Sequence, residues 1–321
     1  MAELNAYLKK LGISLIAAVA VFGVLMLLIS TDAINAYYTR ILMTICINVI
    51  LALSTNLIIN FTGQLTLGHS AFMAIGAYAA AMFSVKAGLP FPLALVLGSV
   101  VAGLFGFLIG LPTLRLKGDY LAVTTMGFCQ IIVVAIQNIP ALGGAQGLTG
   151  IPGKTTFAWV FFSMVLTIIV LGHVVNSSQG RAMISVREDE IAAEAMGINT
   201  TRYKVMAFTI GAFFAGLAGG LFAFLMMFIE PTTFNYFKSI DLVIYVVLGG
   251  TGNFVGCITS TAILTLLPEV LRILGDLRMV IYPLLLIVIM ILRVKGFRFR
   301  KIWQYFENLF TKKGGDSHAA A

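Results

Sequence analysis

The sequence predicts an all-α membrane protein with about eight transmembrane helices and some helices broken by glycines. Of its 321 residues, 60% are hydrophobic and 11% are charged, whereas an ordinary soluble domain has roughly 25% charged residues. Its mean hydropathy is +1.00. The charged residues also leave long gaps, and about 20 apolar residues are enough for one helical crossing of a bilayer. These observations indicate a polytopic membrane protein without a sizeable soluble domain.

The charge-free stretches give the expected crossings in chain order. They are residues 11–31, 41–85, 87–114, 120–153, 155–180, 205–229, 242–268 and 279–292. Most are long enough for one crossing, and 41–85 is long enough for two. The first follows Lys9 and Lys10, but it is longer than the apolar part of a signal peptide and no A-x-A cleavage site follows it. We therefore expect it to be the first membrane helix.

The distribution of basic residues predicts that both termini face the cytoplasm. With the N-terminus inside, most of the 21 Lys and Arg residues fall on cytoplasmic segments, as the positive-inside rule requires. The six on outer loops are Arg40, Lys86, Lys154, Lys238, Arg272 and Arg278. The net charge of +8 is thus explained by membrane topology. This charge does not indicate a nucleic-acid partner, because the sequence contains no soluble domain that could carry a basic surface.

Successive crossings place the connecting loops on alternate sides of the membrane. This order fails once, at residues 241–268, which read "DLVIYVVLGGTGNFVGCITSTAILTLLP". If this stretch crossed the membrane once, the basic C-terminal segment would lie outside. Four glycines, Gly249, Gly250, Gly252 and Gly256, interrupt it near its middle. Broken helices are tolerated in membranes where the freed backbone faces protein or water. We therefore expect a re-entrant hairpin that starts and ends outside, with residues 249–256 at depth.

The polar loop 177–204 predicts a short amphipathic helix over residues 186–196. Ser185 and Glu188 have the spacing of a capping box, and Gly197 is a typical helix-ending glycine. At about 100° per residue, one face carries Arg187, Glu190 and Glu194, and the other carries Ile191, Ala192, Ala195 and Met196. The helix could dock into another protein, or it could be a connector that lies at the lipid interface.

No constellation typical of an enzyme is found in the sequence. The three histidines, His69, His173 and His318, are widely spaced, and no nucleophile motif such as G-x-S-x-G occurs. Cys46, Cys129 and Cys257 lie in apolar stretches without motif spacing, so they are expected to be buried packing residues. A secondary transporter would usually carry an acidic residue in mid-span, which is not found here. We expect no catalysis, cofactor or metal on this chain.

Several motifs together resemble one family of transport proteins. They are "NFTGQLTLGHSAFMAIGAY" (60–78), "LRLKGDYLAVTTMGF" (114–128), "GRAMISVREDEIAAEAMGIN" (180–199), "YKVMAFTIGAFFAGLAGGL" (203–221) and "VVLGGTGNFVG" (246–256). In this order they resemble the permease subunits of branched-chain amino acid ABC importers, although urea and short-amide importers share much of the pattern. The lysine-rich segment after Arg293 matches no motif of the family.

The resemblance covers about residues 56–293. We expect one permease domain over residues 1–313, with a coupling loop at 177–204, and a flexible tail at 314–321. The resemblance implies that the chain forms half of a translocation path for leucine, isoleucine or valine in a prokaryotic cell membrane. The implied partners are a second permease, two cytoplasmic ATP-binding subunits, an extracytoplasmic substrate-binding protein and membrane lipid, with no nucleic acid. ATP hydrolysis would take place on the separate subunits. The coupling residues would be Arg187, Glu190, Ile191, Ala192, Glu194, Ala195, Met196 and Gly197.

Polar residues near glycines are the candidates for the translocation path. Gly63 and Gly68 would let the chain turn and restart a helix within the protein, because broken helices often expose backbone groups to substrate. The candidates are Gln64, Thr66, His69, Ser70, Asp119, Tyr120, Thr124, Gly249, Gly250, Thr251, Gly252 and Asn253. The alternative is a structural role: the small residues around Gly76 suit close helix packing, and Asp119 could cap its helix.

Overall fold

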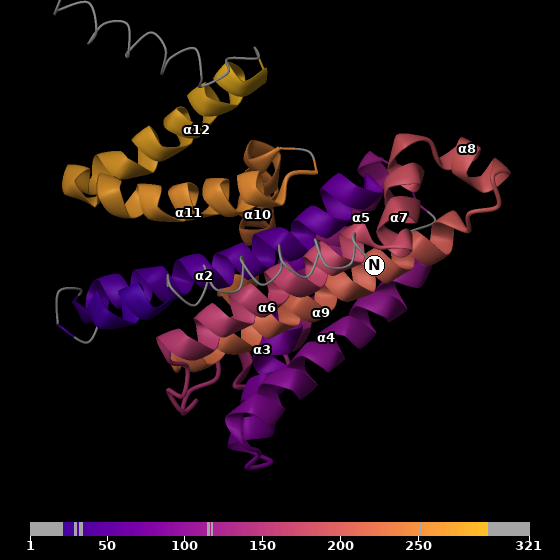
Figure 1. Cartoon of the computed structure of the whole chain (residues 1–321). Helices are drawn as coiled ribbons and strands as arrows, with labels where there is room; N and C mark the ends of the chain where they lie inside the picture. The colour runs from indigo at the N-terminus through magenta and orange to yellow at the C-terminus, as the bar shows by residue number, and fades with distance from the viewer. Residues whose placement is uncertain are drawn as a thin grey trace, which may run out of the picture. The chain divides into compact units, whose positions relative to one another are not determined.

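The computed structural model describes residues 22–28, 31, 35–113, 116, 118–250 and 252–294. Within these ranges the chain is helical, and its only pairing of the β type is an isolated bridge between Leu148 and Ile229. The chain divides into two compact units, Met1–Leu266 and Leu267–Ala321. Figure 1 shows the helices of both units.

The first unit contains most of the helices. They are α2 (Ala36–Asn56), the π-helical turn η1 (Leu57–Phe61), α3 (His69–Val85), α4 (Phe91–Thr113), α5 (Asp119–Gln137), η2 (Pro140–Leu142), η3 (Gly144–Gln146), α6 (Phe157–Asn176), α7 (Ser178–Glu188), α8 (Glu190–Ala195), α9 (Thr200–Met226), η4 (Pro231–Phe234), α10 (Tyr236–Gly249) and α11 (Phe254–Val270), which continues past the division. The second unit contains η5 (Leu271–Leu277) and α12 (Arg278–Val294).

Six helical stretches of the described residues are long and apolar enough to cross a membrane. They are Ala36–Phe61, Phe91–Thr113, Asp119–Gln137, Phe157–Asn176, Thr200–Met226 and Phe254–Ile291, and α3 is a shorter apolar helix. The last stretch is broken at Gly275, whose backbone is not helical (φ 57°, ψ −129°). Most of the expected first crossing, 11–31, lies outside the described residues, as does the segment 314–321. The structure therefore agrees with the fold class, but it does not give a count of eight.

Small residues allow α3, α4 and α9 to pack closely at the centre of the first unit. A Cβ atom added to Gly76 of α3 would lie 2.2 Å from the Cα atom of Gly216 in α9, and one added to Gly219 would lie 2.0 Å from the carbonyl oxygen of Met73. Backbones approach this closely only where a side chain is lacking. The small residues around Gly76 therefore have the packing role that was one of the two sequence interpretations.

The chain reverses and restarts a helix between α2 and α3, as predicted. α2 ends in the π-helical turn, Gly63 has a positive φ of 71°, and α3 begins at His69. The Nε2 atom of His69 lies 2.7 Å from Oγ of Ser54, which is two residues before the end of α2. The extended segment 63–68 therefore runs back along α2 before the new helix starts.

Helices α10 and α11 form the helical hairpin that the glycines predict. Gly250 and Gly252 have positive φ angles of 98° and 71° at the turn, and Oγ of Ser260 donates to the carbonyl of Tyr245 across the hairpin at 2.7 Å. The reversal is confirmed, but the expected position of the turn is corrected. The Nδ2 atom of Asn60 in η1 donates to the Gly250 carbonyl at 3.2 Å, so the turn lies beside η1, which directly follows α2. The turn was expected at depth, but it does not lie halfway along α2, because α10 and α11 run beside α2 to its end.

Candidate functional site

The polar segment between α6 and α9 contains two helices, so the single helix predicted over 186–196 is wrong. α7 starts at Ser178 and is capped by Ser177, which places Ser185 inside it. Asp189 interrupts the helix with an extended backbone, and its Oδ1 accepts from the backbone N–H groups of Ile191 and Ala192 at 2.9 and 3.1 Å. A carboxylate that satisfies two free N–H groups is a strong helix start, and it outweighs the continuation of α7. Gly197, with φ 81°, follows the end of α8 as expected.

The polar side of α8 faces the protein and its apolar side faces outward. Glu190 forms an ion pair with Lys204 of α9 at 2.6 Å, and Oε1 of Glu194 accepts from Oγ1 of Thr200 at 2.7 Å. On the other side, Ile191 is 78% exposed and Met196 is 82% exposed. We call Ile191, Ala192, Ala195 and Met196, which are all exposed, the α8 apolar face. The placement of Glu190 and Glu194 opposite the apolar residues agrees with the sequence, but Arg187, predicted on the same face, lies on α7. Glu190, which was expected on an open charged face, is a partly buried partner of Lys204.

Arg187, near the end of α7, connects three parts of the first unit. Its Nη1 donates to the backbone carbonyl of Asn60 in η1 at 2.7 Å, and its guanidinium also pairs with Glu188. A Cβ atom added to Gly63 would lie 3.2 Å from Cγ of Arg187, and one added to Gly252 would lie 3.8 Å from its Nη1. The end of α2, the segment after it and the hairpin turn therefore all meet at Arg187.

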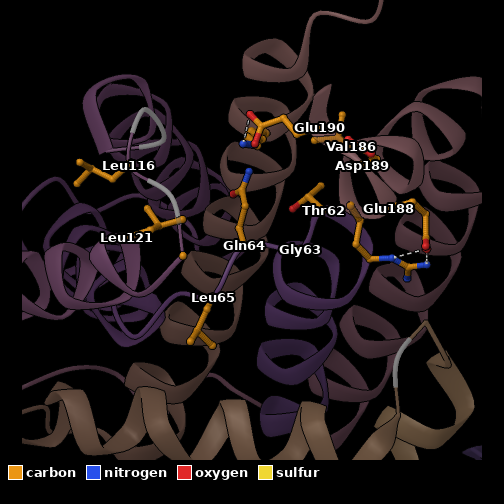
Figure 2. Close-up of a pocket in the computed structure, with 13 residues that line it drawn as sticks. Thr62, Gly63, Gln64, Leu65, Leu116, Leu121, Val186, Glu188, Asp189 and Glu190 are labelled. Carbon is orange, nitrogen blue, oxygen red and sulfur yellow. Dashed lines mark hydrogen bonds and ion pairs between the residues drawn. The ribbon is translucent and has the colours of Figure 1, made fainter. Parts of the chain in front are cut away.

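A pocket of about 200 Å³ lies between the α7–α8 segment and the segment that follows α2 (Figure 2). It is lined by Thr62, Gly63, Gln64, Leu65, Leu116, Gly118, Leu121, Val186, Arg187, Glu188, Asp189, Glu190 and Lys204. Figure 2 shows the Gln64 side chain directed toward Glu190. Gln64 is only 4% exposed, and neither atom of its amide group has a hydrogen-bond partner within the described structure. The pocket thus joins a predicted path residue to predicted coupling residues.

The other polar residues of the 63–70 stretch have structural contacts in the interior. Thr66, His69 and Ser70 are fully buried. Oγ of Thr66 accepts from the backbone N–H of Gly68 at 3.4 Å. Ser70 donates through Oγ to the carbonyl of Asn235 at 2.8 Å, and Ser239 of α10 donates to the same Oγ at 2.8 Å. The structure places these three side chains among helices of the same chain, and none of them lines the pocket.

The remaining path candidates are spread over two places. At the start of α5, Gly118 occupies the cap position and Asp119 is the first helical residue, so the expectation that Asp119 caps the helix is wrong. Tyr120 is 77% exposed, and Thr124 is partly buried. Gly249, Gly250, Gly252 and Asn253 form the turn of the hairpin, while Thr251 lies outside the described residues. The structure does not bring these two places together in one pocket.

Two residues that contribute to this region were not recognised in the sequence. Lys204 supplies the cation for Glu190, and Asn60 contacts both Arg187 and the hairpin turn. A lysine at the start of a long apolar helix and an asparagine at the end of another are the available signals. Lysines are common at membrane boundaries, and a single asparagine in an apolar stretch has no motif around it, so neither signal is specific.

The described structure defines the class of the protein as a multi-pass α-helical membrane protein with an ordered polar segment at one end of its helices. The family model described as "Branched-chain amino acid transport system / permease component" matches residues 37–292. The chain therefore belongs to this family of transport permeases.

Individual relatives point in the same direction. The high-affinity branched-chain amino acid transport system permease protein LivM of Salmonella typhimurium is 35% identical over 285 residues, which cover 78% of this chain and 67% of that protein. LivM of Escherichia coli is 34% identical over the same length and shares. The fructose import permease protein FrcC of Rhizobium meliloti is 27% identical over 233 residues, which cover 68% of this chain and 64% of that protein. No solved structure matches the chain.

Proposed function

We propose that this chain is one permease subunit of an ATP-driven importer that carries leucine, isoleucine or valine into a prokaryotic cell. The support is its membership of the branched-chain amino acid permease family and the names of the two LivM relatives that cover most of its length. In this proposal a second permease completes the path, two ATP-binding subunits act from the cytoplasm, and an external binding protein delivers the amino acid. The α7–α8 segment and both chain termini then face the cytoplasm.

The observation that carries the coupling part of the proposal is the orientation of α8. Its two glutamates are directed toward α9, through the contacts of Glu190 with Lys204 and of Glu194 with Thr200. Ile191 and Met196 are therefore left largely exposed at the end of the first unit. A connector on its own would gain by turning these apolar side chains inward. An exposed apolar surface on a polar segment is typical of a docking site, and here the partner is an ATP-binding subunit.

The contacts of this segment suggest how a docked subunit could move the membrane helices. Lys204 links α8 to α9, and Arg187 links α7 to the end of α2 and to the neighbourhood of the hairpin turn. Closure of the two ATP-binding subunits would displace α8, and these links would pass the displacement to α2, α9 and the hairpin. Transport then needs a shift between two arrangements of helices and no covalent step on this chain.

The variant Ala195→Arg tests the docking of α8. It adds bulk and charge to a close contact, which commonly costs several kcal/mol at an interface, while arginine is nearly as good a helix former as alanine. We expect normal abundance in the membrane but loss of ATP-binding subunits on purification and loss of uptake. Ala145→Arg, at an exposed alanine in η3, is the matched control and should behave like the parent protein.

The same reconstituted system decides the substrate. The parent complex with its binding protein should take up leucine, isoleucine or valine only when ATP is present. Normal uptake by Ala195→Arg at normal abundance would show that α8 is only a connector. Uptake of urea in place of leucine would assign the chain to the urea and short-amide importers, which are the alternative.

A further inference from the structure

The amide group of Gln64 indicates that the pocket beside α8 has a ligand. This side chain is 4% exposed, it is directed into the pocket (Figure 2), and both its donor and its acceptor have no partner in the described part of the chain. Buried polar groups are nearly always hydrogen-bonded. An amide in this position can donate one bond to a negative group and accept another from a positive group.

Charged residues of both signs line the pocket: Arg187 and Lys204 are basic, and Glu188, Asp189 and Glu190 are acidic. Glu190 and Lys204 form an ion pair at 2.6 Å, with side chains that are 25% and 10% exposed. Both line the pocket. A small molecule that has both an ammonium and a carboxylate group can lie antiparallel to this ion pair. Its ammonium group then lies beside Glu190 and its carboxylate beside Lys204, so that each charge meets an opposite charge.

Only part of the remaining lining is apolar, and that part suits a branched side chain. Leu65, Leu116, Leu121 and Val186 line the same pocket. Its volume of about 200 Å³ is smaller than the roughly 300 to 1,000 Å³ of sites for drug-sized ligands. One free amino acid is therefore a better match than a nucleotide or a larger metabolite.

We infer that this pocket binds the transported amino acid on the α8 side of the protein, and that bound amino acid slows the transport cycle. The inference rests on the proposed function for the identity of the amino acid. The carboxylate is held by Lys204 and the N–H of Gln64, the ammonium by Glu190 and the oxygen of Gln64, and the side chain by the leucines. The ligand joins the α7–α8 segment to the segment after α2, so it stabilises one arrangement of parts that the cycle must move.

Direct binding is measured on the purified complex of permeases and ATP-binding subunits, without the external binding protein and without nucleotide. Equilibrium dialysis with radiolabelled leucine should give saturable binding with one site per copy of this chain. Gln64→Met keeps the length of the side chain and removes its polar atoms, so we expect affinity to fall about tenfold or more. The melting temperature of this variant without leucine should stay equal or rise, because an unpaired buried amide is removed. Gln146→Met, in the exposed η3, is the matched control and should bind as the parent does.

Leucine analogues test whether both charges and the side chain are recognised. 4-Methylpentanoate lacks the ammonium, 3-methylbutylamine lacks the carboxylate, and glycine lacks the side chain, so each should bind more weakly than leucine. A second variant, Leu65→Trp, places a larger group at a 36% exposed position of the pocket wall and should also block binding. In vesicles whose ATP-binding subunits face outward, added leucine should lower the rate of ATP hydrolysis by the parent complex. It should not change the rate of ATP hydrolysis by the Leu65→Trp complex.

Either of two results overturns the inference: no saturable leucine binding by the parent complex, or parent-like affinity in both Gln64→Met and Leu65→Trp. Hydrolysis that is insensitive to added leucine overturns its regulatory part. Leucine uptake by a complex that fails these binding tests leaves the proposed function intact. Transport of a different substrate class refutes the proposed function itself.

Discussion

Single glycines decide where backbone segments of this protein approach one another. Gly68 lies where the chain restarts a helix, and a Cβ atom added there would lie 2.3 Å from the carbonyl oxygen of Thr125 in α5. The N–H of the preceding Leu67 bonds to Oγ1 of Thr125 at 3.1 Å. The position of the 63–68 segment, and with it the Gln64 side chain, therefore depends on a contact that only glycine allows.

At this scale, Gly68→Ala should reduce the amount of folded protein in the membrane. The added methyl group meets backbone of α5, which cannot move aside as a flexible side chain would, and overpacking of this kind typically costs about 1 to 3 kcal/mol. Melting temperature and membrane abundance measure the effect. Gly127→Ala in α5, where an added Cβ atom has nothing within 4 Å, is the control and should be neutral or slightly stabilising. Equal stability of the two variants would contradict the close approach at Gly68.

The elements at the α8 end act together because their contacts converge on few side chains. α7 reaches η1, which directly follows α2, through Arg187, α8 reaches α9 through Glu190 and Lys204, and η1 reaches the hairpin turn through Asn60. The residues of the α8 apolar face take no part in these three contacts. Docking of a partner and transmission of its movement are therefore assigned to different residues, and they can be separated by substitution.

Arg187→Ala should uncouple ATP hydrolysis from uptake while the ATP-binding subunits stay bound. It removes the charge-assisted hydrogen bond to the Asn60 carbonyl, which is worth about 1.5 to 3 kcal/mol, and leaves the α8 apolar face unaltered. Uptake per ATP hydrolysed should fall about tenfold or more. Arg187→Lys should be intermediate, since lysine keeps the charge but lacks the forked donors of arginine.

The control for this experiment is Arg202→Ala, an exposed arginine in the first turn of α9, which should keep normal coupling. If Arg187→Ala instead releases the ATP-binding subunits, Arg187 belongs to the docking surface and does not act as a link.

At the scale of the whole molecule, the order of the helices and the hairpin determine at which end of the first unit each connecting segment lies. α9 starts beside α8 and ends at Met226. Ile229, shortly after the end of α9, pairs with Leu148. The hairpin turn lies again near Arg187. The first unit thus has α7 and α8 at one end (Figure 1), and the Leu148–Ile229 bridge follows the far end of α9. The proposed topology assigns the end with α7 and α8 to the cytoplasm.

Cysteine labelling in intact cells tests this assignment. Thr233→Cys and Asp276→Cys are at exposed positions and should react with a membrane-impermeant maleimide from outside. Gln179→Cys, at an exposed position of α7 that is not part of the α8 apolar face, should react only after the cells are opened. The background should be low because all three native cysteines are buried. Lys238 is unsuitable for this test, since its Nζ donates to Asn48 of α2 inside the bundle. Labelling of Asp276→Cys only in opened cells would contradict a hairpin that starts and ends outside.

Composition and local pattern by themselves determined the class of the protein, the restart of a helix after Gly63, the reversal at Gly250 and Gly252, and the two faces of the segment around Glu190. Each of these follows from residues close together in the chain, through hydropathy, backbone freedom or helical periodicity. The break at Asp189 also has a local cause. Ser185 and Asp189 are two competing helix starts in the sequence, and the structure shows the start at Asp189, whose backbone is extended.

Only the tertiary structure decided which polar residues meet. His69 and Ser70 are as polar as Gln64 in sequence, yet they are bonded to Ser54 and Asn235 inside the bundle, while Gln64 is directed into a pocket with Glu190 and Lys204. The physical reason is that hydrogen-bond partners of a buried group come from whatever helix packs against it. That packing depends on close contacts such as those at Gly68 and Gly76, which join segments far apart in the chain.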